Sequence, residues 1–135
     1  MGRFVLILLD THVVVWLAFE TVRISRPAQA AIDDARQAER GLAISDFTLF
    51  ELSSLFRKRR FSLITSPESF LAEVERRFVI LPITANVTLQ AFALPASYPK
   101  DPADRIIGAT ALVEGLTLVT ADAQIRKSRA VPTIW

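Results

Sequence analysis

Short apolar runs alternate with longer amphipathic segments along this chain of 135 residues. The apolar runs are rich in β-branched residues and are bounded by turn signals, which is typical of strands. Phe4–Leu9 is the clearest run, because an unbroken series of apolar residues indicates a strand that is covered on both faces. The other predicted strands are Leu42–Ser45, Phe78–Ile83, Leu116–Thr120 and Val131–Ile134.

The segments between these runs carry helix signals. Asp101 is a candidate N-cap, Pro102 suits the first helical position, and Gly115 ends the helix that they begin. Ser25 precedes a helix in the same way, with small and apolar residues along one face. The remaining predicted helices are Val13–Phe19, Phe47–Arg59, Pro67–Arg77, Thr84–Leu94 and Ala123–Lys127; the Ser25 helix extends to Glu39, and 95–99 is expected to be a loop.

This alternation predicts one α/β domain, residues 1–135, in which a central, mainly parallel sheet of about five short strands lies between two layers of helices. Ligands of such sheets bind beyond the carboxyl ends of the strands. Asp10 and Asp122 lie just after predicted strands, so both are expected at that edge. Asp104 is expected there too, because it lies in the first turn of a helix that runs back antiparallel to the next strand.

Composition is that of a globular protein, with 51% hydrophobic and 22% charged residues. The absence of cysteine excludes a disulfide scaffold and a thiolate metal site, and is compatible with a reducing cytoplasm. The first apolar run ends at Asp10 with no small-residue cleavage site, unlike a signal peptide. No window contains the ~18 uninterrupted apolar residues of a membrane span. We therefore expect a soluble cytoplasmic protein with no membrane contact.

Glu51 adds a fourth acid to the three at the expected edge. On a helix its neighbours three and four residues away include Phe47 and Leu55, so its carboxylate is expected on a largely inward-facing stripe. A buried carboxylate needs a cation, for which an arginine or a metal ion are the candidates. Each of the other acids also has a structural explanation, as a helix N-cap or as a partner of the helix dipole.

Four acids at one edge are harder to explain as separate caps. Their mutual repulsion would raise their pKa values unless a divalent cation were bound. Ligation by oxygen alone, with no cysteine and one histidine, indicates a hard ion such as Mg²⁺ or Mn²⁺. Hydrolysis of a phosphodiester by a metal-activated water is the chemistry that follows from such a site.

Three blocks of sequence resemble the PIN domain family, and within it the VapC toxins of bacterial toxin–antitoxin pairs. They are LLDTHVVVW (8–16), ISDFTLFEL (44–52) and DPADRIIGATALVEGLTLVTAD (101–122). The resemblance extends over nearly the whole chain, and its last block is the most specific. The family's four acids fall on Asp10, Glu51, Asp104 and Asp122. The resemblance implies a PIN fold, cleavage of RNA that depends on Mg²⁺ or Mn²⁺, inhibition by a VapB-like antitoxin, and a homodimer.

The chain departs from the family pattern at two places. His12 stands where Asn or Ser is common, and Asp101 is a second candidate ligand beside Asp104. We prefer Asp104 as the ligand, because the family's third acid immediately precedes the apolar helix and Asp101 suits the cap. His12 is the only histidine, which excludes a ribonuclease mechanism that needs two, and a structural role is favoured for it over contact with metal or substrate.

Several polar residues near the acids are further candidates. Thr11 and Thr120 either orient the acids by hydrogen bonds or cap strand ends. Arg105 is expected to neutralise an acid or to touch the substrate. The basic run contacts RNA phosphates or is a solvated helix end, and the sequence leaves both open; it comprises Arg57, Lys58, Arg59 and Arg60.

Three other functions remain open for a small α/β domain with acids at the sheet edge. A receiver-like phosphoacceptor domain would need a lysine at a late strand end, and the residues VTADAQ (119–124) contain none. A phosphatase with an aspartate nucleophile after the first strand would want a second aspartate two positions on, where His12 lies. The third alternative is a PIN-fold binding module without catalysis.

Overall fold

The computed structural model describes residues 6–37, 41–58 and 65–135. Within these ranges the elements follow in the order β1 (Ile7–Leu9), α1 (Thr11–Phe19), a 3₁₀ turn η1 (Thr21–Arg23), α2 (Arg26–Gln37), β2 (Leu42–Ser45), α3 (Asp46–Lys58), α4 (Pro67–Arg77), β3 (Phe78–Leu81), α5 (Ala85–Ala93), α6 (Pro102–Glu114), β4 (Thr117–Val119), α7 (Ala123–Ser128) and β5 (Thr133–Ile134).

The strands form one sheet in the order β3-β2-β1-β4-β5, and every neighbouring pair is parallel. On the central strand, Leu8 is opposite Ala43 of β2 and Leu118 of β4. The prediction of a parallel sheet of about five strands is thus confirmed. Because β2 and β4 flank β1, the segments that follow these three strands meet at one edge of the sheet.

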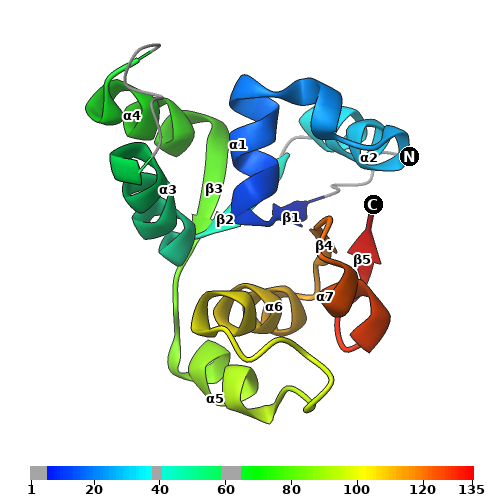
Figure 1. The fold of residues 1–135 in the computed structure, drawn as a ribbon. Coiled ribbons are helices and arrows are strands. Elements are labelled where there is room, and N and C mark those ends of the chain that lie inside the picture. Colours follow the sequence, from blue (N-terminus) through cyan, green and yellow to red (C-terminus); the bar gives the residue numbers. More distant parts are fainter. Residues whose placement is uncertain (1–5, 38–40, 59–64) are drawn as a thin grey trace.

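Helices cover both faces of the sheet, as Figure 1 shows: α1 to α4 lie on one side, and α6 and α7 lie on the other, with α5 outside α6. The alternation of strand side chains explains the two layers. Ile7 and Leu9 belong to a core that includes residues of α1 to α4. Leu8, between them, belongs to a second core with residues of α6 and α7. None of the described helices is both long and apolar enough to cross a membrane.

The elements are shorter than the sequence predicts at several ends. The strand predicted at 78–83 ends at Leu81, because Pro82 has no N–H to donate to a neighbour. Leu116 is not part of β4, since its N–H bonds to the carbonyl of Ala111 and closes the end of α6. Gly115, at φ 68°, provides the left-handed turn that this closure requires. The first predicted strand begins outside the described residues, and the last one is reduced to Thr133–Ile134.

Candidate metal centre

The candidate acids lie at the carboxyl edge of the sheet. Asp10 directly follows β1, and Asp122 comes shortly after β4. Asp104 lies in the first turn of α6, and Glu51 lies on α3, which follows β2. The pKa of Asp104 is raised to about 7, first by burial and then by the negative charges of Asp10, Asp101, Asp122 and Glu51. These acids are therefore close enough to interact electrostatically.

Asp10 is buried and is held by hydrogen bonds at both of its carboxylate oxygens. The N–H of Thr11 donates to Oδ1 at 2.8 Å, and the hydroxyl of Thr120 donates to Oδ2 at 2.7 Å. Burial raises the pKa of Asp10, and the bond from Thr120 opposes this rise. Asp10 also caps the N-terminus of α1, so its structural role and its place in the site coincide.

Glu51 is half-buried and is held by Thr11. The hydroxyl of Thr11 donates to Oε1 at 2.5 Å and lies 3.1 Å from the hydroxyl of Thr48. Burial raises the pKa of Glu51, and the negative charges of Asp10 and Asp101 add to the rise. Thr11 therefore links the two carboxylates, because its N–H donates to Asp10 and its hydroxyl donates to Glu51. Thr11 and Thr120 thus make hydrogen bonds to two of the candidate acids, and Thr120 also accepts from the N–H of Asp122, so both predicted roles of these threonines remain predictions.

Asp101 and Asp122 act as helix caps. The side chain of Asp101 accepts from the N–H groups of Ala103 and Asp104, at 2.8 and 3.2 Å, as expected of the N-cap of α6. Asp122 is exposed, and its Oδ1 accepts from the N–H of Ile125 at 2.9 Å at the start of α7. Its negative charge nevertheless adds to the raised pKa values of Asp10 and Asp104.

Within the described residues, no lysine or arginine forms an ion pair with the acids of the site. The ion pairs in these ranges join Arg23 to Glu20 and two arginines of α4 to Glu73. Over the same ranges, however, no three acidic or histidine side chains are grouped closely enough to hold a metal ion together. Mg²⁺ tolerates such spacing because it keeps several waters and is bound by one or two carboxylates. The residues fit a hard divalent ion, and the set of four ligands stays a prediction.

Arg105 has a different role from the one expected. Its guanidinium donates to the carbonyls of Ala91 and Leu94 at 3.1 and 3.2 Å, and so caps the C-terminus of α5. His12 is exposed in the first turn of α1, and its positive charge lowers the pKa values of Asp10 and Glu51.

The basic run is described only in part. Arg57 and Lys58 are exposed in the last turn of α3, which is compatible with both of their predicted roles. Arg59 and Arg60 lie outside the described residues.

Tyr98 is a residue of the site that sequence reasoning missed. It lies in the expected loop between α5 and α6, yet it is fully buried, and its hydroxyl donates to the main-chain carbonyl of Asp104 at 2.7 Å. A Cβ atom at position 108 would lie 2.2 Å from that hydroxyl. A glycine inside a predicted helix often has a packing reason, and Gly108 was therefore the available signal.

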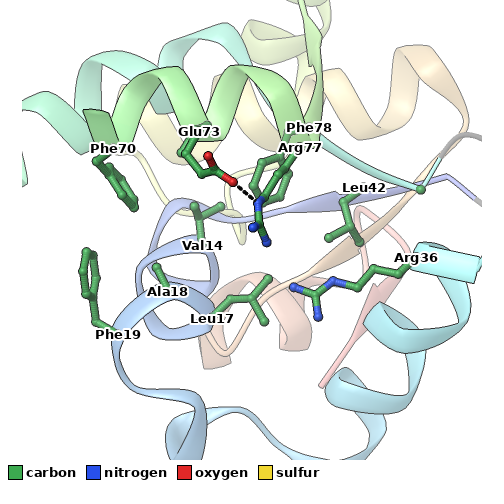
Figure 2. A pocket seen from close by; sticks show the side chains of 12 residues that line it. Val14, Leu17, Ala18, Phe19, Arg36, Leu42, Phe70, Glu73, Arg77 and Phe78 are labelled. Atoms are coloured by element: carbon green, nitrogen blue, oxygen red, sulfur yellow. Dashed lines mark hydrogen bonds and ion pairs between the residues drawn. The ribbon is translucent and has the colours of Figure 1, made fainter. Parts of the chain in front are cut away.

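A groove of about 590 Å³ lies between α1, α2 and α4, on the face of the sheet that α6 does not cover. Figure 2 shows Val14, Leu17 and Ala18 of α1 on one wall, and Arg36 of α2 and Arg77 of α4 reaching toward the space from either side. At one end the rings of Phe19 and Phe70 lie 5.3 Å apart. None of the four acids lines this groove, so it is distinct from the candidate metal centre.

Comparison with known proteins gives consistent results. Residues 7–130 match the PIN domain family. The chain is 38% identical over 131 residues to the ribonuclease VapC22 of Mycobacterium tuberculosis. The aligned region covers 96% of this chain and 98% of that protein. Its fold resembles that of VapBC2 from Rickettsia felis bound to a promoter DNA fragment, with a TM-score of 0.70, 18% identity, and coverage of 95% of this chain and 96% of that one. A toxin–antitoxin complex from Klebsiella pneumoniae gives a TM-score of 0.66 at 24% identity, over 93% and 94% of the two chains.

Proposed function

Because the chain belongs to the PIN domain family, we propose that it is a metal-dependent endoribonuclease, a VapC-type toxin that hydrolyses RNA phosphodiester bonds and is neutralised by a VapB-like antitoxin. The observation that supports this most strongly is the group of acids with raised pKa values, Asp10, Glu51 and Asp104, which has no arginine or lysine partner among the described residues. The 38% identity to a ribonuclease supports the same chemistry.

Asp10, Glu51, Asp104 and Asp122 are the residues that would hold Mg²⁺ or Mn²⁺. When bound, the ion supplies a nucleophilic water at neutral pH and neutralises the charge that builds up on the phosphate. Neighbouring side chains and backbone groups hold these carboxylates in place. Thr120 and the backbone of Thr11 fix Asp10, and the hydroxyl of Thr11 fixes Glu51, so these carboxylates need little rearrangement on binding.

The alternatives are weaker on the same residues. A receiver-like domain uses a lysine near its acidic pocket, and 119–124, which include the end of β4 and the start of α7, contain none. Glu51 also lies on a helix rather than at a strand end. A PIN-fold binding module without catalysis would retain the fold and lose cleavage, so the activity assay separates it from the proposed enzyme.

The test is cleavage of RNA by the purified protein. We expect cleavage with Mg²⁺ or Mn²⁺, none in EDTA, and recovery when the ion is added back in excess. Asp104→Asn should abolish cleavage, whereas Asp34→Asn, which alters an exposed acid on α2, should leave it unchanged. Full activity of the wild-type protein in EDTA would contradict the proposal.

The groove between α1, α2 and α4 is the surface that we assign to the antitoxin. Its walls are largely apolar, while Arg36 is exposed at its rim and Arg77 is paired with Glu73. An amphipathic helix fits this chemistry, with apolar residues in the groove and an acidic residue directed at Arg36. The toxin–antitoxin assemblies among the structures of similar fold support a partner of this kind.

A second copy of the chain is the occupant that we assign to the outer face of α5. Leu89 and Phe92 are 70% and 84% exposed there, one helical turn apart, and the helix sequence ANVTLQAFA contains no charged residue. A face without charge offers nothing to a partner of opposite charge, whereas it is complementary to itself in a two-fold contact. This supports the homodimer implied by the resemblance.

A further inference from the structure

Tyr98 lies in the connection between α5 and α6 and is buried as completely as the core. It is 0% exposed and packs with the core that lies between the sheet and α6. Burial raises the pKa of its hydroxyl, and the negative charges of Asp104, Asp10 and Asp122 add to the rise. The phenol lies beside the acidic site, and its hydroxyl is a hydrogen-bond donor there.

The hydroxyl of Tyr98 donates to the main-chain carbonyl of Asp104, at 2.7 Å. Asp104 lies in the first turn of α6, and its carboxylate belongs to the candidate metal centre. Two other contacts hold the same end of the helix: Asp101 caps its N–H groups, and Arg105 ties it to α5. Of these three side chains, Tyr98 is the one that is bonded to the carbonyl of Asp104.

Gly108 makes this contact possible. A Cβ atom at position 108 would lie 2.2 Å from the hydroxyl oxygen of Tyr98 and 2.7 Å from its Cζ, closer than real Cβ atoms approach other atoms. In a regular α-helix the N–H of residue 108 points to the carbonyl of residue 104, so a group that reaches this carbonyl passes the backbone of residue 108. Glycine is unfavourable inside a helix, and Gly108 lies within α6, which indicates that the contact is specific.

We propose that Tyr98 is a positioning residue for Asp104: its hydroxyl, packed against Gly108, fixes the turn of α6 that carries the Asp104 carboxylate, and thereby sets the affinity of the site for a divalent cation. The inference rests on the proposed function, because it takes Asp104 to be a metal ligand. It assigns a role to Tyr98, in the α5–α6 connection, and to Gly108, inside α6. Neither residue is one of the acids of the site.

The test compares Mn²⁺ binding by calorimetry in variants of the whole protein. Tyr98→Phe keeps the ring that fills the core and removes the hydroxyl. Thr110→Val is the matched control, because the hydroxyl of Thr110 is also buried and donates to a carbonyl of α6, that of Ile106, at 2.7 Å. We expect the dissociation constant for Mn²⁺ to rise about tenfold or more in Tyr98→Phe and to change by less than about twofold in Thr110→Val.

Gly108→Ala tests the same contact from its other side, and it keeps every polar group while displacing the hydroxyl. We expect a similar loss of Mn²⁺ affinity, and in the double variant a loss no larger than that of the worse single variant, because both changes break one contact. Wild-type affinity in Tyr98→Phe and Gly108→Ala, or an equal loss in Thr110→Val, would overturn the inference. Failure of the wild-type protein to bind Mn²⁺ would contradict the proposed function itself, and the inference with it.

Discussion

The hydroxyl of Thr120 donates to Oδ2 of Asp10 at 2.7 Å, joining two buried residues that are 110 positions apart in the chain. The bond connects the ends of β4 and β1, which are neighbours in the sheet. It lowers the pKa of Asp10 and so opposes the effect of burial. Thr120 therefore helps to keep this carboxylate ionised and turned toward the site.

Thr120→Val should weaken metal binding and slow RNA cleavage, by about 10- to 100-fold, because Asp10 loses a bond that orients it and favours its charged form. The measurement is the cleavage rate as a function of Mg²⁺ concentration, with the Mg²⁺ requirement expected to rise. Thr120→Ser retains the hydroxyl and is the control, with expected rates close to those of the wild-type protein. Equal rates for the valine and serine variants would contradict this role.

The raised pKa of Asp104 predicts how the stability of the metal-free protein depends on pH. The pKa is about 7 in the folded protein, against the ordinary value of 3.8. Between these pH values the folded state binds more protons than the unfolded state, so stability falls as the pH rises through this window. This loss of folding stability is absent below the ordinary pKa and complete above pH ~7.

Asp104→Asn removes the carboxylate whose ionisation lowers the folding stability. In EDTA at pH ~8, we expect the variant to be more stable than the wild-type protein by about 1 kcal/mol, a value reduced for the solvent screening of a half-exposed group. The difference should shrink as the pH is lowered, and Mn²⁺ should stabilise the wild-type protein but not the variant. Urea denaturation at several pH values measures both effects. A variant that is less stable than the wild-type protein at high pH would show that the charge of Asp104 is compensated.

The local pattern of the sequence was sufficient for the order of the main strands and helices, though not for all of their ends, and for the positions of Asp10 and Asp122 after strands. Strand runs followed by Asp10 and Asp122 put both at the carboxyl edge, because all strands of a parallel sheet point the same way. The choice of Asp101 as the cap of α6 followed from its position before Pro102, and the structure confirms it.

The features that sequence reasoning missed depend on how distant elements pack. The guanidinium of Arg105 turns to the end of α5, and Tyr98 turns into the core against Gly108; neither contact leaves a periodic trace in the sequence. The groove between α1, α2 and α4 has the same origin, since its walls come from segments that are separated along the chain.

The exposed basic residues at the end of α3 give a prediction about RNA binding. Arg57→Gln with Lys58→Gln should lower the affinity for single-stranded RNA and reduce the slope of log affinity against log salt concentration by about 0.7 for each phosphate contact that is lost. The matched control is Arg126→Gln with Lys127→Gln, which removes two exposed cations from α7. A reduction that is equal in both double variants would indicate a nonspecific effect of net charge.

The two assigned protein interfaces predict separable effects. Ala18 is exposed and lines the groove, and Leu89 is 70% exposed on α5, so neither substitution removes a core side chain. Ala18→Glu introduces a negative charge into a groove whose rim carries Arg36, where it repels an acidic partner or competes for that arginine. We expect it to weaken binding of the VapB-like antitoxin about tenfold or more, because a charge buried without a partner is costly.

Leu89→Glu should leave antitoxin binding intact and shift the free protein toward the monomer in analytical ultracentrifugation, since the second copy would bury a charge at the same place. RNA cleavage without the antitoxin should persist in Ala18→Glu. Loss of antitoxin binding in Leu89→Glu together with wild-type binding in Ala18→Glu would show that the two surfaces have been assigned to the wrong partners.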